Sequence, residues 1–396
     1  MTVPDRVVAG IDPHADTIHV AVITTTGKPV TDSEFPTTPD GYRRAVTFVT
    51  AAGDLERVGV EGAAGYGAGV SRALRTAGVE VVDVARPSRA DRRRAGKSDQ
   101  IDAYHAARSV LAGRLSPVKD PSIDGMRALH LARRSAVKAR TATMNQIVSI
   151  LVMAPDPVRE KFRNLKGERL VTAVIRARNP LEPADHNTVT ALKVLAERHR
   201  HLTGQIDQLI TRIDPLVTAA HPALRAAYGV GPDTAAQLLI TAGNNPDRLT
   251  SEASFAALCG VAPVPASSGK TSRHRLSRGG DRAANNALYR IALVRMSNHT
   301  PTKAYVARQT SRGRSKLEII RMLKRAIARE IYRLLTQPVT VPDYSDLRPA
   351  RQAKNITLTA AANQFGLWPT TISRLERGQQ RDDTLAQHYR DWLLTA

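Results

Sequence analysis

Four carboxylates in the first quarter of the sequence are placed where they could share metal ions. Asp12 ends the first predicted strand, and Glu61 ends a strand predicted over 57–60. Asp99 and Asp102 are spaced i, i+3 at the start of a predicted helix, so they lie on one face of it. Such a cluster would repel itself unless divalent cations neutralised it, and hard oxygen ligands suit Mg²⁺ or, in its place, Mn²⁺. Two such ions about 4 Å apart would activate the attacking oxygen and stabilise the leaving oxygen in phosphoryl transfer.

Each of these acids also has an ordinary structural interpretation. Asp12 could start a turn, and Asp99 could cap the helix that follows it. Their order along the chain, at two strand ends and then at a helix start, is what favours a shared site over these separate roles.

A serine pair lies in a second block that could do chemistry. Ser267 and Ser268 stand beside a glycine within a basic stretch, where the local positive field favours a developing alkoxide on serine. Ser-Ser-Gly is also common in loops, so composition alone does not select a nucleophile. The cations of this stretch would cradle a phosphate backbone; they are Lys270, Arg273, Arg275, Arg278 and Arg282.

Other segments have the composition of nucleic-acid contacts. The turn at Gly229 and Gly231 precedes a helix start and presents backbone N–H groups that can grip a phosphate, although an ordinary tight turn fits equally well. Two further basic segments could contact nucleic acid. The first is a predicted loop with Arg92, Arg93, Arg94 and Lys97, and the second lies near a predicted helix and contains Arg312, Arg314 and Lys316. For the second segment, a solvated helix face is the alternative.

The elements that must position these residues predict an α/β domain followed by helical domains. Short β-branched runs over 7–12 and 17–23, split by a turn, and alternating strands and helices up to residue 112 favour a mixed sheet flanked by helices. Helical stretches over 121–153 and 188–219 resemble an antiparallel or coiled-coil arm. The predicted domains are an α/β domain at 1–118, a helical arm at 119–219, a serine-bearing helical domain at 220–338, and a small helical tail at 350–396 after a linker with Pro338, Pro342 and Pro349.

Charge and composition restrict the partners. The 396 residues contain 58 Lys and Arg against 36 Asp and Glu, a formal net charge of +22. Such a field attracts polyanions, of which nucleic acid is the usual one. No apolar run approaches the roughly 18 residues of a spanning helix, and the single Cys259 excludes an internal disulfide framework. The sequence therefore predicts a soluble, cytoplasmic protein that binds no membrane and associates with the nucleoid.

The tail carries a separate pattern. Residues 358–367 and 370–378 resemble a helix-turn-helix of the phage-repressor type, with Gly366 at the turn and the second helix as the recognition helix. A small helical docking tail is the alternative.

The carboxylate segments resemble the signature of a known family. The segments Gly10-Ile11-Asp12, Val60-Glu61-Gly62 and Lys97-Ser98-Asp99-Gln100-Ile101-Asp102-Ala103 are similar to those of the DEDD-type, RuvC-like insertion-sequence transposases called the "one-ten" family, which includes the Piv-type invertases. The resemblance implies an RNase H-like fold for the first 115 residues, with Asp12, Glu61, Asp99 and Asp102 as Mg²⁺ ligands. Many relatives have a lysine where Ala15 stands, so any role of that lysine is absent here.

The serine block resembles the second domain of the same family, through the segment Cys259-Gly260-Val261-Ala262-Pro263 and the basic stretch after it. The family pattern implies that Ser268 is the nucleophile, with Ser267 as the adjacent alternative, and that a phosphoserine holds one DNA end during strand exchange. It further implies donor and target duplexes as substrates, a bridge RNA as guide, and a homo-oligomer, either a dimer or a tetramer. Core members of the family usually lack the tail, so the resemblance implies no role for it.

Two other functions remain open from the sequence. A RuvC-like junction nuclease would use the carboxylates and water, and would keep its activity after Ser268→Ala. A non-enzymatic DNA-binding regulator would be unaffected by Asp12→Ala.

Overall fold

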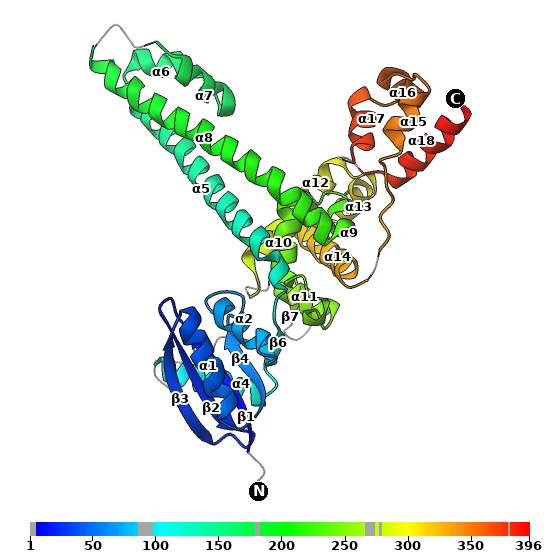
Figure 1. Ribbon diagram of the computed structural model, residues 1–396. Helices are drawn as coiled ribbons and strands as arrows, with labels where there is room; N and C mark the ends of the chain where they lie inside the picture. The colour runs from blue at the N-terminus through cyan, green and yellow to red at the C-terminus, as the bar shows by residue number, and fades with distance from the viewer. Residues whose placement is uncertain are drawn as a thin grey trace. The chain divides into compact units, whose positions relative to one another are not determined.

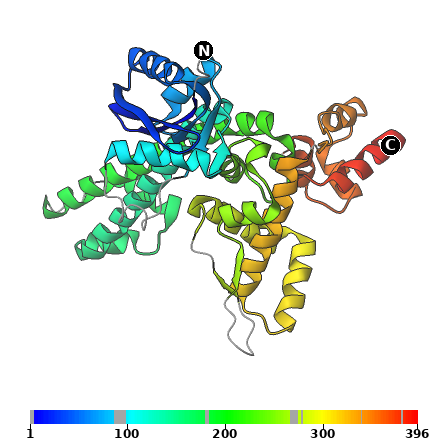
Figure 2. The same ribbon diagram turned by 90° about the horizontal axis from the view of Figure 1, so that it is seen from below.

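The chain forms two compact units, which the ribbon diagrams show from two directions (Figures 1 and 2). The computed structural model describes residues 5–85, 98–178, 183–265, 274–276, 279–337, 339–378 and 381–396. Unit 1 comprises Met1–Asp124 together with Ala242–Ser251, and unit 2 comprises Gly125–Thr241 and Glu252–Ala396. The sequence predicted a simple linear order of domains; instead, a short segment from beyond residue 240 is part of the first unit.

Unit 1 is built on a six-stranded mixed sheet of order β3-β2-β1-β4-β5-β6. β1, β2 and β3 pair antiparallel, β4 and β5 continue parallel to β1, and β6 closes the edge antiparallel. This confirms the predicted mixed sheet, and the order is consistent with an RNase H-like domain. β6 was not predicted because three residues carry no periodicity. The strands are β1 (Arg6–Pro13), β2 (Thr17–Thr24), β3 (Pro29–Pro36), β4 (Asp54–Glu61), β5 (Val81–Val84) and β6 (Leu115–Pro117).

Helices cover both faces of this sheet. On one face, α1 (Pro39–Ala51) and α2 (Ala68–Thr76) bury their apolar stripes against the side chains of β1, β2 and β4. On the other face, α4 (Asp99–Leu111) packs a short apolar stripe against β1 and β5. The three-layer arrangement leaves the ends of β1 and β4 and the start of α4 as the elements that carry the four predicted carboxylates.

Gly10 allows α4 to lie directly on β1. A Cβ at Gly10 would stand 2.1 Å from the backbone nitrogen of Ala107 and 2.3 Å from the carbonyl oxygen of Ala103. Gly59, which pairs with Gly10 across β1 and β4, is similarly close to Val110 of α4. These two glycines and the alanines of α4 therefore allow close packing. This contact sets the distance between α4 and the sheet.

We expect Gly10→Ala to destabilise the protein by about 3 kcal/mol or more, because the added methyl group meets backbone atoms that cannot move aside without shifting α4. Urea unfolding followed by circular dichroism would measure the change in the free energy of unfolding. Gly204→Ala is the matched control: it lies in a helix with open space around it, so it should be neutral or slightly stabilising. Equal stability of the two variants would contradict this account of the contact.

Unit 2 begins with two long helices, α5 (Asp124–Met153) and α8 (Pro183–Ala220), which run alongside each other in Figure 1. The segment between them forms two further helices, α6 (Asp156–Phe162) and α7 (Gly167–Arg176), which lie between the two helical stretches predicted from the sequence. Pro155 is the N-cap of α6 and Pro157 lies in its first turn, where proline is tolerated. The apolar faces of α6 and α7 pack with the facing ends of α5 and α8.

The rest of unit 2 comprises shorter helices and one small hairpin. In α14, a stripe of buried isoleucine and leucine packs inward. Pro349, predicted to lie in a linker, is instead in the first turn of α15. The elements are α9 (Pro222–Ala226), α10 (Pro232–Ala242), α11 (Glu252–Leu258), β7 (Pro263–Pro265), β8 (His274–Leu276), α12 (Arg282–Asn298), α13 (Thr300–Ser311), α14 (Lys316–Thr336), α15 (Leu347–Ala353), α16 (Leu358–Gln364), α17 (Pro369–Glu376) and α18 (Asp383–Thr395).

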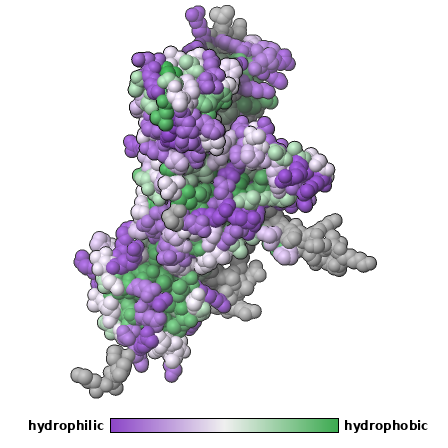
Figure 3. Space-filling view, turned by 90° about the vertical axis from the view of Figure 1, so that its right-hand side faces the viewer, coloured by the Kyte–Doolittle hydropathy of each residue, from purple (hydrophilic) through white to green (hydrophobic). Residues whose placement is uncertain are grey.

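The surface carries mixed hydropathy. On the face drawn in Figure 3, hydrophilic residues are interspersed with hydrophobic ones. Within the described ranges, every helix is too short or too polar to cross a membrane.

Candidate functional site

The four predicted carboxylates lie at the ends of the elements expected to carry them. Asp12 is near the end of β1 and only 5% exposed, and Glu61 ends β4 and is 9% exposed. Asp99 and Asp102 lie in the first turn of α4. The cap of that helix is Ser98, whose hydroxyl accepts from the backbone N–H of Ile101 at 3.2 Å. The alternative role for Asp99 as the helix cap is therefore wrong, and the Asp99 carboxylate is not used in capping α4.

His14, which was not among the predicted site residues, lies beside two of these carboxylates. His14 Nδ1 lies 3.8 Å from Asp12 Oδ2, and His14 Nε2 lies 3.1 Å from Asp99 Oδ1. One ligand atom from each of these three residues lies within 4.8 Å of the other two. His14 belongs to the turn between β1 and β2, and only its position two residues after Asp12 could have suggested its role.

The pKa of Asp12 reflects its burial and the charges of the other three acids. Burial raises the pKa of Asp12 to about 6, and His14 opposes the rise. The negative charges of Glu61, Asp102 and Asp99 raise the pKa further, because each disfavours a second charge nearby. The four carboxylates therefore form one electrostatic cluster, although they come from two strands and a helix.

The donor set fits a divalent cation. Asp12 Oδ2 is buried and has no hydrogen-bond partner among the described residues, and a buried unpartnered carboxylate oxygen is costly unless something positive faces it. Carboxylate oxygens are the ligands that hard divalent cations prefer, and an imidazole nitrogen extends the set to softer transition metals.

We expect the metal-free protein to lose stability as the pH rises through 6. In the folded state Asp12 binds its proton more tightly than its ordinary pKa of 3.8 allows, so its contribution is fully present below that value and is lost above about pH 6. Relative to Asp12→Asn, the wild type should lose about 1 kcal/mol between pH 5 and 7.5 in EDTA. Urea unfolding measures this. Added Mg²⁺ should stabilise the wild type more at pH 7.5 than at pH 5, and an identical pH dependence in both proteins would contradict the assignment.

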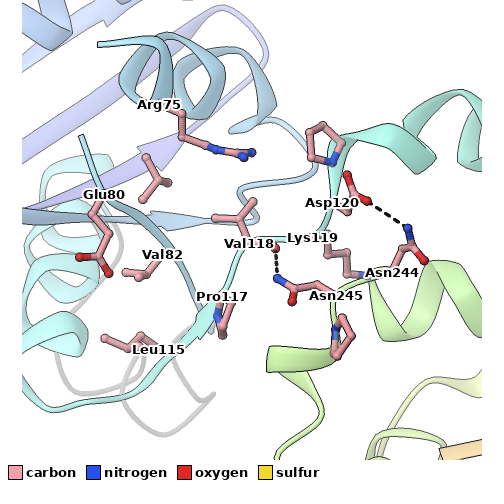
Figure 4. Close-up of a pocket in the computed structure, with 13 residues that line it drawn as sticks. Arg75, Glu80, Val82, Leu115, Pro117, Val118, Lys119, Asp120, Asn244 and Asn245 are labelled. Carbon is pink, nitrogen blue, oxygen red and sulfur yellow. Dashed lines mark hydrogen bonds between the residues drawn. The ribbon is translucent and has the colours of Figure 1, made fainter. Parts of the chain in front are cut away.

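A cleft of about 480 Å³ lies at the β5–β6 edge of unit 1 (Figure 4). It lies where the segment Ala242–Ser251 meets the chain after β6. Asn245 Nδ2 donates to the carbonyl of Val118 at 3.0 Å, and Asn244 Nδ2 donates to Asp120 Oδ2 at 3.0 Å. Arg248 donates to the Pro117 carbonyl and to Asp83 on β5. These bonds make the segment a strap across the edge of the sheet.

The Gly229–Gly231 turn in unit 2 is held by ionic contacts. Asp233, at the start of α10, accepts from Arg133 of α5 and Arg290 of α12 and lies 3.1 Å from His130. Burial alone would raise the pKa of Asp233, but these partners lower it well below its usual range. A Cβ at Gly231 would meet open space, and the turn lines a cleft of about 980 Å³. Gly231 thus has open space beside it at the cleft, whereas Val230 is buried and its N–H donates to the Ala227 carbonyl at 3.0 Å.

The remaining predicted site residues are divided between described and undescribed parts of the chain. Arg275 lies on β8, which pairs with β7 to form the hairpin that flanks the serine pair. Arg282 and the trio Arg312, Arg314 and Lys316 are exposed. Those outside the described residues are Arg92, Arg93, Arg94, Lys97, Ser267, Ser268, Lys270, Arg273 and Arg278.

Three cations of α14 have structural partners instead. Lys324 donates to Asn285 at 2.8 Å, and burial lowers its pKa. Arg325 and Arg329 pair with Glu252. These residues therefore contribute to packing within unit 2.

Both regions with candidate chemistry match known families. Residues 9–154 match a family model described as a transposase, of the DEDD type in the IS110 group, and residues 221–307 match one described as the transposase IS116/IS110/IS902 family. A curated relative from Streptomyces coelicolor, described as the insertion element IS110 uncharacterized 43.6 kDa protein, is 30% identical over 156 residues, or 39% of this chain. The match spans 37% of that relative's length. The first range contains the carboxylate cluster, and the second contains the Gly229–Gly231 turn and the serine pair.

Proposed function

The chain belongs to the IS110 family of transposases, and from this premise we propose that it cleaves and rejoins DNA strands as the transposase and site-specific recombinase of an insertion sequence. The observation that carries the proposal is the cluster of Asp12, Glu61, Asp99 and Asp102, whose charges converge on one buried carboxylate. Among the described residues, Asp12, His14 and Asp99 are the group whose ligand atoms lie close enough together to hold a metal ion, and Asp12 Oδ2 is buried without a hydrogen-bond partner.

The carboxylates would hold divalent cations, with Mg²⁺ as the expected ion and His14 beside them. When bound, the cations supply Lewis-acid stabilisation of negative charge on the scissile phosphate. The chain positions the site through the close contact of α4 with β1 at Gly10, which sets the first turn of α4 beside the end of β1. Burial of Asp12 excludes water from one side of the cluster and strengthens its attraction for positive charge.

Ser268 would act as the nucleophile. Its Oγ attacks the phosphorus, the phosphate–sugar ester bond breaks, and the departing sugar oxygen takes a proton, which leaves one DNA end as a phosphoserine ester. A sugar hydroxyl of a second strand then attacks the same phosphorus and releases the serine. Because each ester replaces another, rejoining needs no energy cofactor.

The DNA-binding surface would combine several features of low sequence selectivity. The Gly229–Gly231 turn, which lines a cleft, and the exposed cations Arg282, Arg312 and Arg314 are suited to phosphate contacts. Family membership supports a bridge RNA that pairs with donor and target DNA and supplies the missing selectivity. It also supports a homo-oligomer that brings two duplexes together, and we propose both on that basis. The tail would add a helix-turn-helix-like module.

A covalent trapping assay tests the proposed function. Purified protein is incubated with Mg²⁺, a duplex carrying the element junction and the flanking transcript, and is then run on a denaturing gel. A protein–DNA adduct that forms with Mg²⁺ and disappears with EDTA is the expected result. Cleaved DNA without an adduct would indicate a nuclease that uses water, and intact DNA under all conditions would overturn the enzymatic proposal.

A further inference from the structure

The last 50 residues form a module with an apolar core of its own. The helices α15 to α18 bury Leu347, Ile372 and Leu375 together with Tyr389 and Leu393. The rings of Phe365, Tyr389 and Trp392 pack with centroids 5.7 to 5.9 Å apart. Three aromatic rings therefore pack together in this small region, so the arrangement of its helices is well determined by its core.

Two of these helices, α16 and α17, follow one another across a short turn. α16 ends at Gln364 and α17 begins at Pro369, and Gly366 between them has a φ of 63°, a conformation that favours glycine. The backbone N–H of Gly366 donates to the Asn363 carbonyl at 3.2 Å. The turn is therefore short and fixed, as it must be to hold a second helix at a set angle to the first.

A buried ion pair fixes the rotation of α17 about its axis. Glu376 is 7% exposed and accepts from Arg351 Nε at 2.6 Å and from Arg351 Nη2 at 3.1 Å. It also accepts from the Tyr389 hydroxyl at 2.8 Å. Ile372, one turn before Glu376, and Leu375, directly before it, are also buried. The inward face of α17 is therefore occupied by core residues and its opposite face is the exposed one, with Arg374 on the rim of the cleft that the Gly229–Gly231 turn also lines.

The outward face of α17 carries polar, cationic and aromatic side chains. Thr370, Arg374 and Arg377 are exposed, and Trp368 at the helix start is 78% exposed. Between residues 354 and 378 the sole carboxylate is Glu376, which is buried and neutralised by Arg351. Every exposed charge in this stretch of the described chain is therefore positive, whereas the acids of the tail lie before it and after it.

We propose that α17 enters the major groove of duplex DNA and reads base sequence directly, as an activity separate from strand cleavage and from any guide RNA. An α-helix with its side chains is about 10–12 Å in diameter, and the major groove, about 12 Å wide, admits one; α17 has eight residues. An arginine can pair bidentately with guanine, and a threonine methyl group can contact thymine. Duplex RNA is a poor fit because its major groove is too narrow for a helix.

Selection from a random duplex library tests this proposal. The full-length protein is incubated with 40-base-pair duplexes of random sequence in EDTA at 0.15 M salt, and the bound DNA is sequenced. The wild type should enrich a short motif. Arg374→Ala should lower the affinity for that motif about tenfold to a hundredfold. Arg374→Lys should keep binding to random DNA but lose the preference at one position, because lysine retains the charge without the planar fork.

Arg348→Ala is the matched control. It removes an exposed arginine from α15, a helix of the same module, and should leave the motif intact. Retention of the motif in both Arg374 variants, no motif with the wild type, or selection of single-stranded RNA in a parallel library would each overturn the proposal. Because the assay contains no free Mg²⁺ and Ser268→Ala should select the same motif, failure here is distinguishable from failure of the proposed recombinase function.

Discussion

Replacing Ser268 with alanine should abolish the protein–DNA adduct and lower the rate of strand exchange by about 10³-fold or more, as expected when an enzyme loses its serine nucleophile. The reason is that no other group in the proposed reaction can carry the DNA end between the two ester exchanges. The carboxylate cluster lies in unit 1, so the variant should bind Mg²⁺ as the wild type does. Denaturing gels measure the adduct, and calorimetric titration measures metal binding.

Ser267→Ala is the control for this prediction, since it removes the same atoms from the neighbouring position. It should keep the adduct. If the adduct persists in Ser268→Ala and disappears in Ser267→Ala, the nucleophile is Ser267; if both variants form it, the covalent intermediate is on another residue.

Asp102→Asn should lower DNA cleavage by roughly a thousandfold, because metal stabilisation of transition-state charge is worth several kcal/mol and each 1.36 kcal/mol is tenfold in rate. The amide keeps the shape of the first turn of α4 while removing one charge from the cluster. The same change should lower the pKa of Asp12, because Asp102 is one of the carboxylates that raise it. Gel assays of cleavage and the pH dependence of stability in EDTA provide independent readouts.

Asp16→Asn provides a matched control for this second prediction. Asp16 is an exposed carboxylate in the turn that also holds His14, but it is not among the charges that shift Asp12. Its variant should cleave DNA normally. Comparable loss in both variants would mean that general negative charge near the turn matters, rather than the specific cluster.

The sequence was sufficient to predict that the four carboxylates lie at strand ends and at a helix start, because local pattern and residue type coincide there. β-Branched runs ending in Asp12 and Glu61 form strands, and the helix predicted from residue 98 forms with Ser98 as its cap. The packing role of Gly10 and Gly59 could not be predicted from the sequence, since the close approach of strand and helix joins residues nearly 100 positions apart.

What the sequence did not predict depends on distant or positional contacts. His14 reaches Asp99 only because α4 lies over β1, which no spacing along the chain reveals. α6 was missed because Pro157 breaks helices in their interior but is accommodated in a first turn. The ionic contacts of Asp233 with Arg133 and Arg290 join three helices, and such pairs have no periodic signature.

The strap formed by Ala242–Ser251 sets an order of events during synthesis. Residues up to Asp124 contain every strand of the large sheet, yet the groups that bond to Val118, Pro117 and Asp83 are made more than 100 residues later. At roughly 5–20 residues per second, the ribosome needs about 6–25 seconds to reach the end of the strap. For that interval the β5–β6 edge of the nascent sheet lacks its cover, and the domain becomes complete only when the start of the serine-bearing region has emerged.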